Sequence, residues 1–172
     1  MEQAENHIDF MKLALFEAKK AVPTPTAFCV GCVLVTRLPG MKPVILSTGY
    51  SRELPGNTHA EANSLDKARR ISKHELASLF PSQHSLDINQ LLAHTDVYTT
   101  LEPCSVRTSG LDPCAGALID AKVRHCIIGV NEPPDFVRCE GASLLRDAGI
   151  QVTWLNGLEQ ECLRVARGLH SE

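Results

Sequence analysis

The sequence predicts an α/β domain in which helices cover both faces of one sheet. The chain opens with a pair of apolar, hairpin-like runs, and strand-like and helix-like segments alternate from there to its end. That alternation is typical of a sheet sandwiched between helices. A length of 172 residues fits one domain with a substantial core. We therefore expect residues 1–172 to form a single three-layer domain, without internal repeats or linkers.

The first elements are a helix and a hairpin. Residues 7–21 place apolar side chains at helical spacing, and the prolines at 23 and 25 end that helix. Residues 30–36 are apolar and rich in β-branched side chains, which favours a strand. Residues 43–50 follow a Leu-Pro-Gly turn and are expected to pair with that strand.

The middle of the chain is less regular. A loop signal at Pro55-Gly56-Asn57 precedes a helix that should begin near His59 and run through Ala68. Residues 71–94 are ambiguous, and we expect a short helical piece before Pro81 and a surface loop after it.

The second half alternates strand and helix. Gly149 fits a left-handed cap at the end of one of these helices. The expected elements are a strand at 96–100, a helix at 114–121, a buried strand at 125–130, a helix around 142–148, a strand at 150–155 and a closing helix around 158–169.

Composition narrows the class of protein. Seventeen basic and twenty acidic residues give a net charge of −3, which argues against a nucleic-acid partner. No apolar run is long enough for a membrane span, and the N-terminus has no recognisable secretory signal. Seven cysteines, an odd number, are typical of thiols and metal ligands in a reducing compartment. We therefore expect a cytoplasmic protein that does not contact membranes.

Three potential metal ligands stand in a pattern that indicates catalytic zinc. His59 lies two residues before Glu61, and Cys104 and Cys114 each follow a proline. One imidazole and two thiolates form an accepted zinc ligand set, and three protein ligands leave one position open for water. Cys114 stands at an expected helix start, where the helix dipole favours the thiolate form.

Glu61 is the expected catalytic residue. A carboxylate near the metal but not bound to it can take a proton from water and pass protons to a ring nitrogen and a leaving amine. The alternative is a structural zinc clip or a coincidence of buried residues. The joint pattern, with proline before both cysteines, favours the catalytic reading.

At these motifs the chain resembles the zinc-dependent cytidine deaminase superfamily, and within it the riboflavin-biosynthesis pyrimidine deaminases. The two zinc cysteines are separated by nine residues, whereas the nucleic-acid and cytidine branches usually have two. The Cys-Ser-x-Arg-x-Ser-Gly run from Cys104 and the segment 49–61 are similar to the fungal type. The resemblance extends over roughly residues 8–169.

This resemblance implies a fold and a reaction. The fold is a three-layer α/β/α domain with a five-stranded mixed sheet. The reaction is hydrolytic loss of the 2-amino group from a diaminopyrimidinone ribityl phosphate, with zinc as cofactor. Relatives usually form dimers or tetramers, so a homodimer or homotetramer is expected.

Two departures favour the fungal type, which acts on the ribitylamino compound, over the bacterial type, which acts on the ribosylamino compound. Ala27-Phe28-Cys29-Val30-Gly31 replaces a bacterial Asn-Pro-Asn-Val-Gly segment, and Val106 replaces a histidine. The bacterial preference remains an alternative.

Five residues are candidate substrate contacts. Asn57 offers a donor and an acceptor, or else serves only as a turn residue. Arg52 and Arg107 lie in loops beside the site and would bind phosphate, or else remain solvated. Ser105 would contact substrate or cap a local turn, and Glu132 follows a strand at the sheet end where α/β sites form. The carbonyl of Glu102 is a weaker candidate, as an acceptor for the leaving amine.

Other functions would be compatible with the same zinc site or the same fold. The same chemistry would suit a cytidine, deoxycytidylate or tRNA adenosine deaminase, although the long inter-cysteine segment and the acidic pI of about 6.2 argue against the last. A non-catalytic binding protein is a third possibility, which Glu61 argues against.

The Cys29-Val30-Gly31-Cys32 motif is expected to point its thiols to opposite faces. Cys126, Cys139 and Cys162 are expected to pack in the core or against helices. The remaining histidines are expected at the surface or in loops: His7, His74, His84, His94, His125 and His170.

Overall fold

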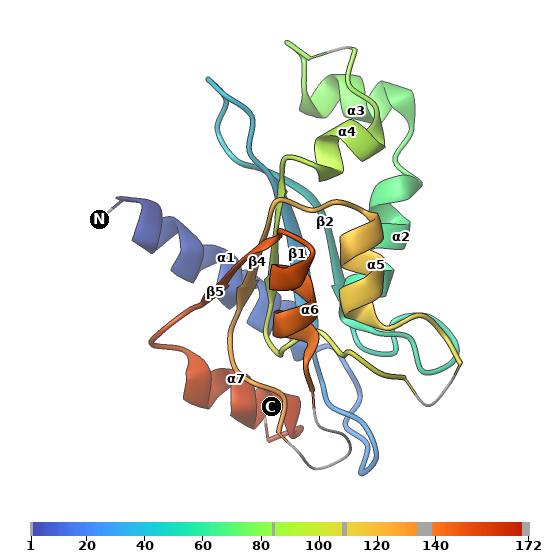
Figure 1. The fold of residues 1–172 in the computed structure, drawn as a ribbon, viewed down its shortest axis with the longest axis vertical. Helices are drawn as coiled ribbons and strands as arrows, with labels where there is room; N and C mark the ends of the chain where they lie inside the picture. The colour runs from blue at the N-terminus through green and yellow to red at the C-terminus, as the bar shows by residue number, and fades with distance from the viewer. Residues whose placement is uncertain (1, 84, 108–109, 134–138, 170–172) are drawn as a thin grey trace.

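Five strands form one mixed sheet in the computed structural model, which describes residues 2–83, 85–107, 110–133 and 139–169 (Figure 1). The spatial order is β2-β1-β3-β4-β5. β1 is antiparallel to both β2 and β3, whereas β3, β4 and β5 run parallel. The five-stranded mixed sheet predicted from the sequence is therefore confirmed. The strands are β1 (Gly31–Thr36), β2 (Val44–Tyr50), β3 (Thr95–Thr99), β4 (His125–Ile128) and β5 (Gln151–Trp154).

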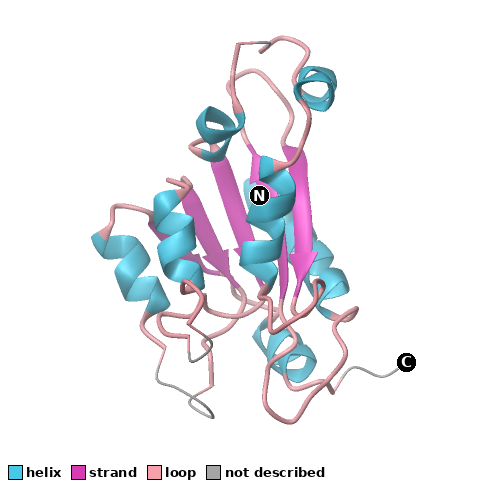
Figure 2. Cartoon of the chain, turned by 90° about the vertical axis from the view of Figure 1, so that its right-hand side faces the viewer, coloured by secondary structure: helices cyan, strands magenta, loops and turns pink. Residues whose placement is uncertain are grey.

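Helices cover both faces of this sheet, as Figure 2 shows. One face packs against α1 and α7, and the other packs against α2, α5 and α6. The predicted three-layer arrangement is therefore confirmed. The helices are α1 (Glu2–Ala18), α2 (Ala60–Arg69), α3 (Lys73–Leu79), α4 (Ile88–Leu92), α5 (Cys114–Asp120), α6 (Gly141–Asp147) and α7 (Glu159–Ala166).

The central strand β1 is buried along its whole length because both of its faces are covered. Cys32 and Leu34 point to the core under α2 and α5, whereas Val33 and Val35 point to the core under α1 and α7. Gly31 allows a close approach, since a Cβ there would lie 1.9 Å from the carbonyl oxygen of Ala14 in α1. The start of β1 is thereby held directly against α1.

The surface loop predicted after Pro81 is wrong in its second half, because α4 lies there. A capping box holds its first turn: the Asp87 side chain accepts from the Gln90 N–H, and the Gln90 side chain accepts from the Asp87 N–H. Leu91 and Leu92 are buried in the core beneath it. Other differences are small, since α1 begins earlier and ends at Ala18. No helix in the described part of the chain is long and apolar enough to cross a membrane.

A cluster of polar side chains lies at the opposite end of the sheet from the loops that follow β3 and β4. It is formed at the end of β1 and at the starts of β3 and β4. We call it the Asp96 cluster, and its centre is fully buried Asp96 between Arg37 and Arg124. Asp96 Oδ2 accepts from Arg37 Nε at 2.6 Å, and Oδ1 accepts from Arg124 Nη2 at 2.6 Å. The surrounding pairs are His7–Tyr98, Arg37–Tyr98 and His125–Thr153.

Two of the histidines expected at the surface or in loops belong to this cluster instead. His125 is the first residue of β4, is 7% exposed, and lies 2.8 Å from Thr153 Oγ1. His7 is half-buried on α1, with Nδ1 2.6 Å from the Tyr98 hydroxyl. Placing both at the surface was wrong because a polar ring can be buried where a partner satisfies its nitrogen.

Candidate metal centre and active site

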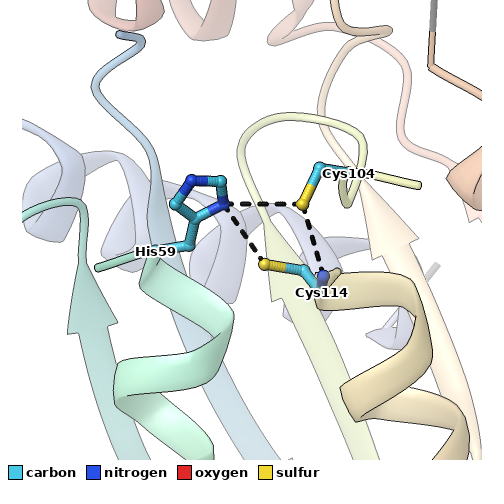
Figure 3. Close-up of side chains that lie close together, drawn as sticks. All are labelled: His59, Cys104 and Cys114. Atoms are coloured by element: carbon cyan, nitrogen blue, oxygen red, sulfur yellow. Dashed lines mark hydrogen bonds between the residues drawn. The ribbon is translucent and has the colours of Figure 1, made fainter. Parts of the chain in front are cut away.

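The three predicted ligands come from three separate elements at one end of the sheet (Figure 3). His59 is the N-cap residue of α2, and Cys114 is the first residue of α5, directly after Pro113. Cys104 lies in the loop that follows β3. One nitrogen or sulfur from each lies within 4.8 Å of the others, and no other such group was found in the described part of the chain.

The spacing of these atoms fits a tetrahedral zinc ion. His59 Nδ1 lies 3.5 Å from Cys104 Sγ and 3.4 Å from Cys114 Sγ. Bond lengths of about 2.3 Å for Zn–S and about 2.05 Å for Zn–N at a tetrahedral angle require about 3.6 Å between nitrogen and sulfur. The donor set therefore suits zinc without rearrangement. Nδ1 is the nitrogen that faces the sulfurs.

The pKa values of the two cysteines shift in opposite directions. Cys104 Sγ accepts from the thiol of Cys114, and the backbone N–H of Cys114 also lies 3.3 Å from it. These hydrogen bonds, with His59, lower the pKa of Cys104 to about 4. Donation to Cys104 and burial raise the pKa of Cys114 well above its usual range. One thiolate is thus already in place for a cation.

Cys104 is anchored from the α6 side as well as by α5. Gly141 at the start of α6 packs so closely that a Cβ there would lie 1.7 Å from the carbonyl oxygen of Pro103. Cys139 Sγ donates to the same carbonyl at 3.3 Å, and the Ala142 N–H donates to Glu102 Oε1 at 3.0 Å. The backbone before Cys104 is therefore held against the beginning of α6.

Glu61 lies in the first turn of α2, as expected, and is 3% exposed. Its Oε1 accepts from the Thr99 hydroxyl at 2.9 Å, and the same hydroxyl lies 3.0 Å from the carbonyl of Leu101. Burial, reinforced by the charge of Cys104, raises the pKa of Glu61. Its position beside the ligands suits a group that exchanges protons.

A cavity of about 250 Å³ opens in front of the ligands. It contains four of the five predicted substrate contacts, together with His59, Glu61 and Cys104. The lining residues are Thr26, Ala27, Phe28, Val30, Ser51, Arg52, Asn57, His59, Glu61, Leu101, Glu102, Cys104, Val106, Arg107 and Glu132.

Two of the predicted contacts, Asn57 and Arg107, meet at the mouth of this cavity. Arg107 Nη2 donates to the main-chain carbonyl of Asn57 at 2.6 Å, and Nη1 lies 3.4 Å from the carbonyl of Asp112. Arg107 Nε is buried without a hydrogen-bond partner. The side chain of Asn57 is exposed. The inter-cysteine segment is thereby joined to the loop that precedes His59.

Arg52 also lines the cavity, and its guanidinium contacts main-chain carbonyls. Nη1 donates to the Phe28 carbonyl at 3.0 Å, and Nη2 donates to the Val22 carbonyl at 2.8 Å. Its Nε is buried without a partner. This side chain therefore joins the loop after β2 to the segment that precedes β1.

The remaining two predicted substrate contacts, Ser105 and Glu132, differ in whether they line the cavity. Ser105 is not among the lining residues, and its Oγ accepts from the Glu140 N–H at 3.1 Å, at the N-cap of α6. Glu132 lines the cavity after β4, and its Oε2 is buried without a partner. Burial raises the pKa of Glu132 to about 7. A group of this kind can donate or accept a hydrogen bond near neutral pH.

Sequence reasoning missed Thr99 and the wall formed by Thr26, Ala27 and Phe28. Thr99 fixes Glu61, and nothing in the strand sequence TDVYT distinguishes it from the other polar residues there. The wall residues follow a helix and two prolines, where no pattern indicates proximity to His59. The two thiols of Cys29 and Cys32 do diverge as predicted: Cys32 lies in the core under α2, while Cys29 Sγ faces the Ala21 carbonyl and Arg52.

Comparison with known proteins places this arrangement in a family context. The profile of the family described as the cytidine and deoxycytidylate deaminase zinc-binding region matches residues 4–130. That range contains all three ligands and Glu61.

Several relatives are named for riboflavin biosynthesis. A diaminohydroxyphosphoribosylamino-pyrimidine deaminase of Schizosaccharomyces pombe is 40% identical over 161 residues, covering 94% of this chain and 35% of its own length. The crystal structure of Aspergillus oryzae Rib2 deaminase in complex with DARIPP is 34% identical with a TM-score of 0.72, covering 96% of this chain and 92% of that chain. A bifunctional deaminase/reductase from Thermotoga maritima is 25% identical with a TM-score of 0.71, covering 97% of this chain and 41% of its own.

Proposed function

We propose a hydrolytic deaminase function from one premise: this chain belongs to the family of cytidine and deoxycytidylate deaminase zinc-binding domains. The observation that supports an intact active site is the convergence of His59, Cys104 and Cys114 beside buried Glu61 at one cavity. The proposed reaction replaces an exocyclic amino group on a pyrimidine ring with oxygen and releases ammonia.

The proposed substrate is 2,5-diamino-6-ribitylamino-4(3H)-pyrimidinone 5'-phosphate, in riboflavin biosynthesis. The names of the yeast and Aspergillus relatives support this class of substrate. The chain spans 35% of the length of the yeast relative, so the assignment concerns the part that the two share. Ala27, Phe28 and Val106 line the cavity at positions where this chain departs from the bacterial pattern, which supports the ribitylamino over the ribosylamino compound.

The proposed cofactor is Zn²⁺, held by His59 Nδ1 and the sulfurs of Cys104 and Cys114. Zinc in this position supplies a Lewis acid that lowers the pKa of water from 15.7 to about 7, which provides a nucleophile at neutral pH. Cys104 and Cys114 would enter as thiolates, and their burial keeps competing solvent away from the ligands.

Glu61 moves the protons in this mechanism. With Oε1 held by the Thr99 hydroxyl, the other carboxylate oxygen is left to receive a proton from the attacking water. As oxygen adds to C2, that proton passes to the adjacent ring nitrogen. The remaining water proton then passes through Glu61 to the exocyclic amine, the C2–N bond breaks, and ammonia leaves as the C2 carbonyl forms.

Five side chains are proposed to orient the substrate. A cavity of about 250 Å³ is at the small end for a ligand pocket, so the base would fill it and the phosphate would lie toward the mouth. Arg107 and Asn57 stand there, and Arg52 is the other cation on the wall. Glu132 would hydrogen-bond the ring amino groups. Ser105 would act through the backbone of Glu140, to which it is bonded.

The experiment that tests the function measures ammonia release by zinc-loaded protein. The panel contains the ribitylamino pyrimidinone phosphate, its ribosylamino counterpart, cytidine and deoxycytidylate. We expect the highest kcat/KM on the ribitylamino compound. Preference for the ribosylamino compound would overturn the side-chain assignment, and activity on cytidine or deoxycytidylate alone would overturn the pathway while retaining the zinc chemistry.

Three further features are proposed on less direct grounds. Residues 1–172 would act as one deaminase unit that forms a homodimer or homotetramer, which sedimentation analysis would measure. Seven free cysteines among the described residues suit a reducing compartment, and we propose the cytoplasm. Fractionation of the producing cells tests that location.

A further inference from the structure

We propose that Arg52 is a positioning residue, which clamps residues 22–30 into the wall that shapes the base end of the cavity. We call residues 22–30 the wall segment, because it contributes Thr26, Ala27, Phe28 and Val30 to the cavity lining. The inference deepens the proposed function and rests on it for its effect on catalysis. Its structural part is measurable without any substrate.

The contacts of Arg52 span the wall segment. Its guanidinium donates to the carbonyl of Val22 at 2.8 Å and to the carbonyl of Phe28 at 3.0 Å, so that one side chain holds both ends. Nη2 also lies 3.4 Å from the sulfur of Cys29, which is 1% exposed. A planar, permanently charged fork is suited to bridging two carbonyls in this way, and a lysine cannot reproduce it.

Neighbouring hydrogen bonds also join the loop after β2 to the wall segment. Ser51 N–H donates to the Val30 carbonyl at 2.9 Å, and the Val30 N–H donates to Ser51 Oγ at 2.9 Å. The Arg52 N–H donates to the Thr58 carbonyl at 2.7 Å, one residue before the ligand His59. Arg52 therefore links the wall segment to the backbone that carries a metal ligand.

The backbone of Arg52 is itself unusual. Its φ of 62° places a non-glycine residue in the left-handed region, and Lys122 is the only other such case in the described part of the chain. That conformation is unfavourable for a residue with a Cβ, and such strain clusters at functional sites. A glycine or asparagine would adopt this backbone conformation more easily. We therefore infer that the contacts of the arginine side chain compensate for the backbone strain.

A positioning role differs from direct phosphate binding in how the guanidinium is used. Two of its nitrogens already donate to carbonyls, and the Nε that remains unpartnered is buried rather than offered to solvent. A phosphate would have to displace these bonds to engage the fork. The two roles therefore predict different responses to removal of the phosphate from the substrate.

The first test measures amide hydrogen exchange by mass spectrometry on Arg52→Lys, Arg52→Asn and a matched control, Arg70→Lys. Asparagine tolerates the left-handed backbone and removes the clamp, whereas lysine keeps the charge. Arg70 is 74% exposed in a surface pair with Asp66. We expect exchange in residues 23–30 to rise about tenfold in both Arg52 variants, with β3 and β4 unchanged. Wild-type exchange in both variants would overturn the proposal.

The second test measures kcat/KM for the phosphorylated substrate and for the same compound without phosphate. A displaced wall predicts a loss of about tenfold on both compounds, because the base end is affected in each. A loss confined to the phosphorylated compound would overturn positioning and assign Arg52 as a phosphate ligand. If the chain deaminates neither compound, the proposed function fails while the exchange result still decides the clamp.

Discussion

The two ends of the sheet each bury polar side chains, but they use them differently. In the Asp96 cluster, both oxygens of Asp96 accept from an arginine, and the Tyr98 hydroxyl bridges His7 and Arg37. At the metal end, one ligand atom from each of His59, Cys104 and Cys114 lies within 4.8 Å of the others. The three unpartnered buried side-chain atoms found in the described residues belong to Arg52, Arg107 and Glu132, and all three residues line the cavity.

The difference separates a structural cluster from a functional one. A polar group that has found its partner inside the fold contributes to stability and has little left to offer a ligand. A group that remains unpaired lowers stability and keeps its hydrogen-bonding capacity for a substrate or cofactor. Variants at the Asp96 end should therefore affect stability, and variants at the metal end should affect turnover.

Metal removal should give the largest effect on turnover. Dialysis against a chelator is expected to reduce ammonia release to background, because the nucleophile depends on the Lewis acid. Stoichiometric zinc should restore it, while far-ultraviolet circular dichroism stays unchanged throughout because the core lies outside the site. Loss of the secondary-structure signal on chelation would instead assign a structural metal.

Glu61→Gln should come next, with kcat reduced by about 10²–10⁴-fold because the amide cannot shuttle protons. Zinc content measured by atomic absorption should remain one per chain, since Glu61 is not a ligand in the proposed set. Glu161→Gln, in a surface pair with Lys19, is the matched control and should retain full turnover. Parent-like turnover by Glu61→Gln would refute the proton-transfer role.

Asp96→Asn should lower stability and leave turnover nearly unchanged. Removing the charge that pairs with Arg37 and Arg124 is expected to reduce the free energy of unfolding by about 3–5 kcal/mol. Denaturant titration measures this, and kcat/KM per folded molecule should stay within about twofold of wild type. Asp66→Asn, at an exposed pair, should change stability by less than about 1 kcal/mol. A specific loss of turnover in Asp96→Asn would erase the distinction between the two ends.

The pH dependence of stability gives the smallest expected effect. Burial and the charge of Arg37 lower the pKa of His7 below 6.5, with Asp96 opposing and Arg124 adding to the shift. The folded state then binds fewer protons than the unfolded state, so stability is present above about pH 6.5 and is lost as pH falls toward the lowered pKa. His7→Gln keeps an acceptor for Tyr98 and should flatten the slope of unfolding free energy between pH 7 and 5. His74→Gln, at an exposed position, should leave the slope as in wild type.

Much of this architecture could be predicted because it depends on local patterns. The alternation of strands and helices led to the three layers, and the spacing of His59, Glu61, Cys104 and Cys114 led to the ligand set and the adjacent carboxylate. Helix α4 also has a local signal in the sequence, since Asp87 and Gln90 are spaced as a capping box.

The remainder depends on contacts between residues that are distant in sequence. Arg52 reaches carbonyls 24 and 30 residues earlier, from a backbone conformation that arginine rarely adopts. Burial of His125 depends on Thr153, which lies on a different strand. A single sequence does not encode such pairings in any local pattern, so these side chains were assigned to loops or substrate on residue type alone.

The close packing of Gly141 against Pro103 has a consequence for which residues position 141 can accept. The start of α6 packs against the backbone before Cys104, and Cys114 is the first residue of α5, so each ligand cysteine is positioned by the start of a helix. Between the two cysteines, Arg107 joins this site to the loop before His59, and Ser105 joins it to Glu140. Because glycine has no Cβ at position 141, a larger residue there would displace the Pro103 backbone and with it the neighbouring ligand Cys104.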